Sequence, residues 1–204
     1  MQAAFLLVGD QPYSRLMVQS LKQLKCPIIQ MSDLKTPKVE GVDEVVRIPF
    51  RVPLTCYRLK HLAEFPHDEM LIVDTDVICK GQIGDVWESE FDVAVTARDP
   101  GVFFSYGKDV SKDMPYNTGV MFSRSQSFWK DCLAWLSDQN DGIQQWYGDQ
   151  LAVAAVSPRY SVKSLPCSEF NWSPNSRQDS SQARFWHYKG AVRKKWLTEQ
   201  LAPS

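Results

Sequence analysis

Two aspartates stand close together at the end of an apolar stretch, in the segment MLIVDTDVICKG at residues 70–81. Because successive side chains of an extended strand point to opposite faces, we expect Asp74 and Asp76 to point the same way. Two carboxylates at that distance repel each other unless a positive charge lies between them. A hard divalent cation removes the repulsion and keeps coordination positions open for phosphate oxygens. The pair therefore predicts a metal that carries a diphosphate, and the alternative is an ordinary polar turn after a strand.

The elements that must position these carboxylates alternate along the chain between apolar runs and helical segments. Strands are expected at 3–9, 26–31, 43–50, 70–74, 91–98 and 119–124, and helices at 14–25, about 55–65, 125–138 and 141–156. Alternation of this kind predicts an α/β sandwich with a mostly parallel central sheet. Ligands of such sheets bind beyond the carboxyl ends of the strands, which is where Asp10, Asp74 and Asp76 are expected.

The composition is that of an ordinary globular protein. The chain has 204 residues, of which 44% are hydrophobic and 23% charged, so we expect a single domain over residues 1–204. A formal net charge of -1 gives no support for a general nucleic-acid or membrane-surface binder. Five cysteines without a CxxC pair, and no leader peptide before the first apolar run, favour reduced thiols and a cytoplasmic location.

Several segments around the aspartate pair resemble, in order, those of a known enzyme family. They are PLTCYRLKHL at 53–62, MLIVDTDVICKGQIGDVW at 70–87, ARDPG at 97–101, YNTGVMFSRS at 116–125, YGDQ at 147–150 and HYKGAVRKKW at 187–196. Together they resemble the retaining glycosyltransferases of the glycogenin and lipopolysaccharide galactosyltransferase type, glycosyltransferase family 8. The resemblance covers most of the chain and implies the GT-A fold, in which one α/β/α sandwich carries the active site.

The resemblance implies a role for each matching residue of the metal site. The first aspartate of the pair, Asp74, would touch metal and ribose, Asp76 would grip the metal, and His187 would complete the protein ligands. A site that mixes imidazole with carboxylates suits Mn²⁺, with Mg²⁺ as the alternative. A histidine between Trp186 and Tyr188 could instead belong to an aromatic cluster.

Nucleotide and diphosphate contacts follow from the same comparison. Tyr13 stands where the family places a tyrosine that stacks on uracil, with Asp10 as a polar neighbour, although a tyrosine packed on the sheet is an equal alternative. Basic residues would stabilise the leaving diphosphate. The expected set is Asp10, Tyr13, Arg58, Asp74, Lys189, Gly190 and Arg193. The family's Gly-x-x-Lys-Pro-Trp ending appears here as GAVRKKW. The basic residue that replaces the family's lysine therefore stays open among Arg193, Lys194 and Lys195. Residues such as Lys194 and Lys195 are more often part of a solvated surface.

Hexose contacts are expected from Asn117, Asp149 and Gln150, whose amides and carboxylate offer the donors and acceptors that sugar hydroxyls need. The resemblance implies that Asp149 or Gln150 lies near the anomeric carbon and that the donor is UDP-glucose or UDP-galactose. The acceptor hydroxyl stays unknown, whether on a saccharide, a protein or another compound. The oligomeric state also stays open, a homodimer included.

Two other functions fit an α/β sheet with metal-binding carboxylates. A sugar-nucleotide nucleotidyltransferase would be expected to have a glycine-rich basic loop after its first strand, whereas VGDQPYSR has one glycine and a proline. A non-catalytic sugar-nucleotide-binding protein would keep the fold and lose metal or sugar ligands. The six expected ligands are all in this chain: Asp74, Asp76, Asn117, Asp149, Gln150 and His187.

Overall fold

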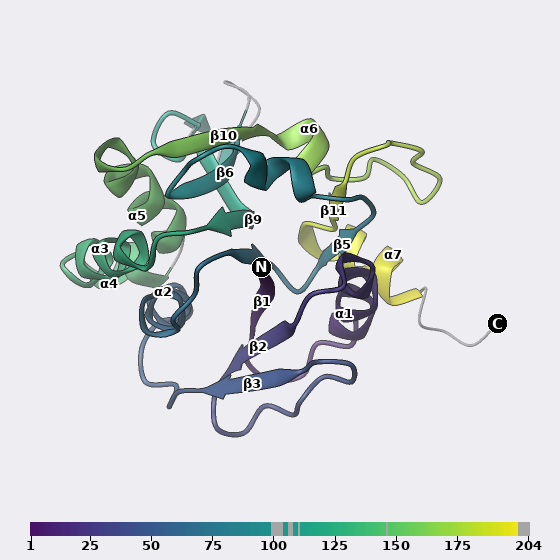
Figure 1. Cartoon of the computed structure of the whole chain (residues 1–204), viewed down its shortest axis with the longest axis horizontal. Helices are drawn as coiled ribbons and strands as arrows, with labels where there is room; N and C mark the ends of the chain where they lie inside the picture. Colours follow the sequence, from purple (N-terminus) through teal and green to yellow (C-terminus); the bar gives the residue numbers. More distant parts are fainter. Residues whose placement is uncertain (99–103, 106–107, 110, 146, 200–204) are drawn as a thin grey trace.

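A computed structural model gives the structure of the chain, and it describes residues 1–98, 104–105, 108–109, 111–145 and 147–199. Its centre is a seven-stranded sheet (Figure 1). In spatial order the strands are β10 (Val162–Pro166), β6 (Val93–Ala97), β9 (Tyr116–Ser123), β4 (Met70–Val73), β1 (Gln2–Leu7), β2 (Ile28–Ser32) and β3 (Glu44–Arg47). Only β9 runs antiparallel to its neighbours β4 and β6; the other pairs are parallel. The predicted α/β class with a mostly parallel sheet is confirmed.

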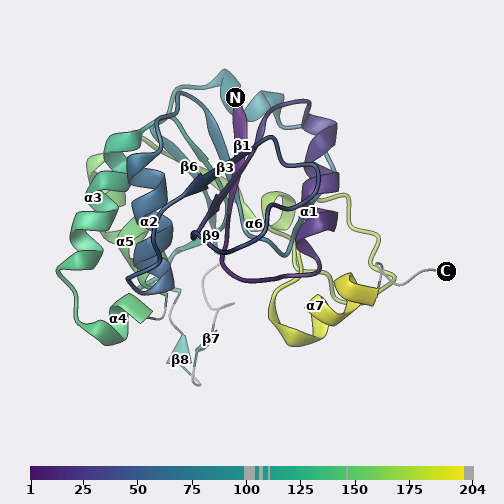
Figure 2. The ribbon, with the colours of Figure 1, turned by 90° about the horizontal axis from the view of Figure 1, so that it is seen from below.

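Helices cover both faces of the sheet (Figures 1 and 2). One face carries α2 (Leu54–Glu64), α3 (Gln126–Ser137) and α5 (Gly148–Val156), and the other carries α1 (Ser14–Leu21) with a 3-10 turn at Lys22–Leu24. Adjacent residues of a strand belong to opposite cores: Ala4 packs with Leu59 and Trp129, whereas Phe5 packs with Met17. This alternation explains why the strands read as continuous apolar runs.

Smaller elements complete the fold at the carboxyl end of the sheet and beside α1. The ribbon of β5 (Val77–Cys79) and β11 (Phe185–His187) is antiparallel, and α7 (Gly190–Glu199) follows it beside α1 (Figure 2). The remaining elements are α4 (Asp141–Gln145), α6 (Cys167–Phe170), the two-residue strands β7 (Phe104–Ser105) and β8 (Lys108–Asp109), and 3-10 turns at Gly84–Glu88 and Ser157–Arg159. No helix within the described ranges is long and apolar enough to cross a bilayer.

A register shift in β9 shapes the edge where a ligand would bind. Against β6, Val95 pairs with Met121 but the next residue, Thr96, pairs with Asn117, so three residues of β9 bulge out between these pairs. Bulges increase local twist and redirect side chains, and they are common beside active sites. Here the bulge places Asn117, Thr118 and Gly119 next to the end of β4.

Two expectations about local structure were wrong. The segment 141–156 is not one helix, because it divides into α4 and α5 with Tyr147 in the left-handed region at φ 59°. The aspartate pair is also not part of an extended strand: β4 ends at Val73, and residues 74–76 form a turn in which the Val77 amide donates to the Asp74 carbonyl at 3.2 Å. The two carboxylates therefore converge through a turn, not through strand alternation.

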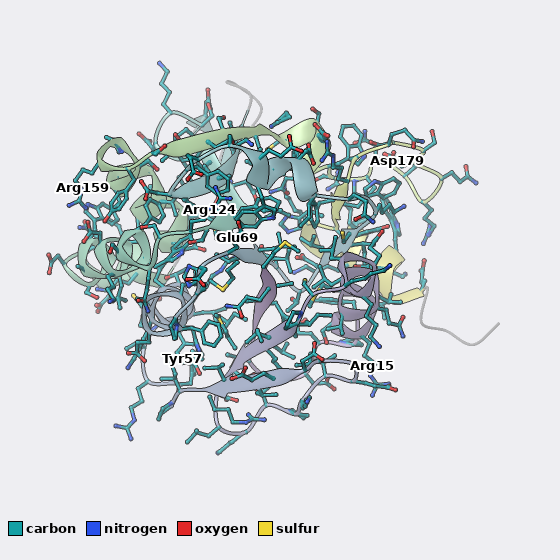
Figure 3. The ribbon with its side chains drawn as sticks, in the orientation of Figure 1. Arg15, Tyr57, Glu69, Arg124, Arg159 and Asp179 are labelled. Atoms are coloured by element: carbon teal, nitrogen blue, oxygen red, sulfur yellow. The ribbon has the colours of Figure 1, made fainter. Side chains whose placement is uncertain are left out.

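The opposite end of the sheet is held by an ion pair. Arg124 directly follows β9 and Glu69 directly precedes β4, and both are labelled near the centre of Figure 3. Arg124 donates to Glu69 at 2.8 Å and to the Trp87 carbonyl at 2.7 Å. Since β9 and β4 pair throughout, this contact supports the register that places Gly119 beside the Asp74 amide at the other end.

Candidate functional site

Asp74, Asp76 and His187 meet at the carboxyl end of β4. Each offers one ligand atom, and the three atoms lie within 4.8 Å of one another. The His187 Nε2 atom is 3.1 Å from Asp76 Oδ1 and 3.6 Å from Asp74 Oδ2. Pairing of β11 with β5 sets this arrangement, because His187 lies directly opposite Val77, the residue after Asp76. The predicted metal triad is thus assembled by the backbone.

The outer oxygen of each carboxylate has a cationic partner. Arg58 Nη2 is 3.0 Å from Asp74 Oδ1, and Lys194 Nζ is 3.1 Å from Asp76 Oδ2. The inner oxygens, which face His187, stay directed at the centre of the triad. Burial alone would favour the protonated form of Asp76, but the hydrogen bond and charge of His187, together with Lys194, lower its pKa to about 2. Asp76 is therefore a carboxylate at neutral pH, as a metal ligand must be.

A network of amides fixes which ring nitrogen of His187 faces the carboxylates. Asn171 Nδ2 donates to Thr96 Oγ1 at 2.9 Å and to Asn117 Oδ1 at 2.7 Å. The side-chain oxygen of Asn171 therefore faces His187 and accepts the Nδ1 hydrogen at 2.8 Å. Asn117 Oδ1 is itself an acceptor, because the Gly119 amide donates to it at 2.9 Å. Nε2 is therefore the ring nitrogen that faces the two carboxylate oxygens, where it can donate a hydrogen bond to Asp76 or, after losing its proton, offer its lone pair to a cation. The donor set fits a divalent metal.

Gly119 makes room for the imidazole. A Cβ atom at this position would lie 2.2 Å from His187 Cε1 and 2.4 Å from Nδ1. Since such approaches are far inside van der Waals contact, only glycine allows the ring to lie against β9 in this orientation.

Arg58 joins the aspartate pair to the predicted sugar residues. It extends from α2 and is buried, with its Nη1 atom 2.9 Å from Asp149 Oδ2 at the start of α5. Thr118 Oγ1 also donates to Asp149 Oδ2 at 3.1 Å, and Arg58 Nη2 donates to the Thr118 carbonyl at 2.8 Å. Burial opposes the charge on Arg58, but Asp74 and Asp149 outweigh it and raise its pKa. Asp149 is held rigidly as a partner of Arg58.

The first cavity, of about 500 Å³, is lined by half of the expected site residues. It is lined by both aspartates of the pair together with Tyr13, Arg58, Asp149, Gln150 and Lys194. Gln150 Oε1 accepts a hydrogen bond from Arg98. Tyr13 donates to Gln11 Oε1 while its ring also packs in a cluster with Trp186, and burial raises the pKa of its hydroxyl. Tyr13 thus packs beside Trp186 at the wall of the cavity, and its stacking on a base stays a prediction.

The other expected residues lie outside this cavity. Asn117, Lys189 and Arg193 line a second cavity of about 500 Å³ on the far side of His187. Burial lowers the pKa of the Lys189 ammonium to about 8. Asp10 is exposed and lines neither cavity, and Gly190 is exposed at the start of α7 with φ 78°.

Sequence reasoning missed four residues that build the site. Asn171 and Gly119 orient His187, Thr118 holds Asp149, and Arg98 holds Gln150. Two of the four, Thr118 and Gly119, stand beside Asn117 within the YNTG motif, which could have pointed to them. Lys194, judged more typical of a surface, pairs with Asp76, whereas Lys195 is exposed and lines neither cavity.

Comparison with known proteins agrees with this arrangement at the level of fold. No protein-family model matches the chain, and no curated protein matches it in sequence. Among solved structures, the galactosyltransferase LgtC in complex with donor and acceptor sugar analogues has a TM-score of 0.65 and 15% sequence identity, covering 100% of this chain and 97% of that one. An active-site mutant of LgtC also has a TM-score of 0.65 at 15% identity, covering 98% of this chain and 95% of that chain. The expected GT-A fold is confirmed, and these neighbours are of the enzyme type that the sequence motifs resemble.

Proposed function

We propose that this chain is a metal-dependent glycosyltransferase that moves a hexose from a nucleoside-diphosphate sugar to an acceptor hydroxyl. The main support for this proposal is that Asp74 Oδ2, Asp76 Oδ1 and His187 Nε2 converge. They do so beside a cavity that is also lined by Asp149 and Gln150. The chemistry of the donor set supports Mn²⁺, since imidazole joins two carboxylates. When bound, the metal would neutralise charge on the leaving diphosphate.

The reaction exchanges one bond to the anomeric carbon for another. The bond from the hexose C1 to the diphosphate oxygen breaks, a bond from C1 to the acceptor oxygen forms, and the hydroxyl proton leaves with the nucleoside diphosphate. Gln150 lines the first cavity with its amide oriented by Arg98, so it can bind a donor hydroxyl in a fixed position. Lys194 pairs with Asp76 and would add positive charge where the diphosphate leaves.

Asp149 acts in this proposal by holding Arg58. Its Oδ2 accepts from both Arg58 and Thr118, and its Oδ1 accepts from the Gln150 amide at 2.9 Å. A carboxylate with these contacts is poorly placed to bond covalently to C1 without losing its partners. The geometry therefore favours Gln150 and the Asn117–Thr118 segment as neighbours of the sugar, with Asp149 as their support.

The identity of the donor rests on the resemblance of the motifs. UDP-glucose or UDP-galactose is the expected donor, with retention of configuration and with Tyr13 beside the base. The position of the Tyr13 ring at the wall of the first cavity is consistent with stacking on a base. A non-catalytic nucleotide-sugar-binding protein is the second candidate, because every ligand-binding contact above would serve it equally well.

Release of UDP from UDP-glucose and UDP-galactose, in Mn²⁺ and in excess chelator, tests the proposal. We expect release only with metal, and we expect Asp76→Asn to abolish both release and metal-dependent UDP binding. Asp68→Asn is the matched control, because Asp68 is exposed and lines neither cavity. Metal-dependent UDP binding without any turnover would favour the non-catalytic candidate. Full activity in chelator would contradict the proposal.

A further inference from the structure

The second cavity differs from the first in the charge of its walls. Among the described residues that line it, the charged ones are Arg98, Lys189 and Arg193, and none is an aspartate or glutamate. The first cavity, by contrast, is lined by three aspartates and two cations. A cavity of about 500 Å³ whose described walls carry three cationic residues and no acid attracts an anionic group.

Two of these cations have no carboxylate partner among the described residues. Arg193 donates from Nε to the Pro174 carbonyl at 2.6 Å and from Nη1 to the Lys189 carbonyl at 3.4 Å, both uncharged groups. Lys189 forms no ion pair within the described part of the chain. Both side chains are half-buried, so their positive charge is held at the cavity and not spread into solvent. Their charge is available to a ligand.

The wall that contains Trp172 and Asn175 is preformed. The loop between α6 and β11 carries Asp179, which is labelled at the outer side of Figure 3. Asp179 Oδ2 accepts from Trp172 Nε1 at 3.2 Å and from the Asn175 amide at 2.9 Å, and both Trp172 and Asn175 line the second cavity. Because the loop is held by its own carboxylate, the cavity does not depend on a ligand to order it.

The second cavity meets the first at two places. Asn117 lines the second cavity and its neighbour Thr118 lines the first. Arg98 lines the second cavity and contacts Gln150, which lines the first. A molecule in the second cavity therefore lies next to a hexose held by Gln150 and the Asn117–Thr118 segment.

We propose that the second cavity receives the acceptor and selects a hydroxyl compound that carries a phosphate or carboxylate group, bound by Lys189 and Arg193. The inference rests on the proposed function, and it names the acceptor class for the same transfer. The acceptor oxygen bonds to C1 of the hexose as the C1 bond to the diphosphate breaks, and the acceptor proton leaves with the diphosphate. The anionic group takes no part in the bond exchange and serves only to hold the acceptor.

Calorimetric titration of the protein saturated with Mn²⁺ and UDP tests the selection. UDP and metal occupy the first cavity, so added glucose, glucose 6-phosphate and glucuronic acid report on the second. We expect one or both charged sugars to bind at least tenfold more tightly than glucose at equal ionic strength, and the two charged ligands separate phosphate from carboxylate. Lys189→Met and Arg193→Gln should each reduce the ratio of charged to neutral affinity about tenfold.

Lys195→Met is the matched control, since Lys195 is exposed on the same helix and lines neither cavity, and its ratio should not change. Equal affinity for glucose and both charged sugars, or a preference that survives both substitutions, would overturn the inference. Failure of UDP and Mn²⁺ to bind in the first step would instead count against the proposed function. Because the ratio compares ligands on one protein, a change in donor affinity does not alter it.

Discussion

Gly119→Ala is expected to damage the metal site without unfolding the protein. The new Cβ atom would lie 2.2 Å from His187 Cε1, whereas ordinary contact begins near 3.4 Å, so the ring must retreat by about 1 Å. Metal–ligand distances tolerate only about 0.2 Å. The imidazole cannot move that far and keep both its bond to Asn171 and its ligand position. Loss of this support should weaken Mn²⁺ binding about 10- to 100-fold, or roughly 1.4 to 2.7 kcal/mol.

The fold should tolerate this substitution. The backbone of Gly119 does not lie in the left-handed region, and its carbonyl still accepts from the Asp74 amide at 2.9 Å. Gly84→Ala is the matched control, because nothing lies within 4 Å of a Cβ atom at that position. Isothermal titration with Mn²⁺ in the presence of UDP measures the affinity, and thermal unfolding confirms that each variant is folded. A folded Gly119→Ala variant that binds Mn²⁺ as tightly as the Gly84→Ala variant would refute the assignment of His187 Nε2 as a ligand.

Three further changes have calculable outcomes. Asn171→Ala removes the acceptor of the His187 Nδ1 hydrogen, so Mn²⁺ affinity should fall about 10- to 100-fold in the same titration. Asp149→Asn leaves the buried charge of Arg58 with one partner fewer, which should lower the free energy of unfolding in urea by about 3 kcal/mol. His61, which packs edge-on against Tyr57, is buried without a hydrogen bond to either ring nitrogen in the described structure, and burial lowers its pKa to about 4. The unfolded chain then binds the extra proton, so stability should fall by about 3 kcal/mol as pH drops from about 6.5 to about 4, and His61→Phe should remove that loss.

Local patterns in the sequence were sufficient for six of the seven strands of the central sheet, whereas β10 was not predicted. The run MLIV is buried at all four positions of β4, and such a run predicts a central strand wherever it occurs. The break between α4 and α5 was not predictable in the same way. Tyr147 adopts a left-handed conformation that is uncommon for a tyrosine, and the apolar residues on both sides read as one helix. Tertiary packing, not propensity, divides this segment.

The three residues of the metal triad were predictable from the sequence, but the contacts that bring them together were not. Asp74 and Asp76 are two residues apart in sequence, whereas His187 reaches them through the pairing of β11 with β5, a contact between distant segments that no local periodicity encodes. Asn171 is harder still, because an asparagine outside a helix or strand carries no signal of the imidazole that it will orient. The resemblance of HYKGAVRKKW to a family segment supplied the histidine but not its support.

The amides that orient His187 also form the wall of the second cavity. Asn171 and Asn117 both line that cavity, and Asn171 sets the proton on His187 Nδ1. An acceptor that competes for the Asn171 carbonyl would therefore change the ligand offered to the metal in the first cavity. Substitution of either amide disturbs both sites at once. Among the described residues, the side chains of Lys189 and Arg193 form no hydrogen bond or ion pair with the metal ligands or with these amides, so substituting them tests the selection of the acceptor without disturbing the hydrogen bonds that orient His187.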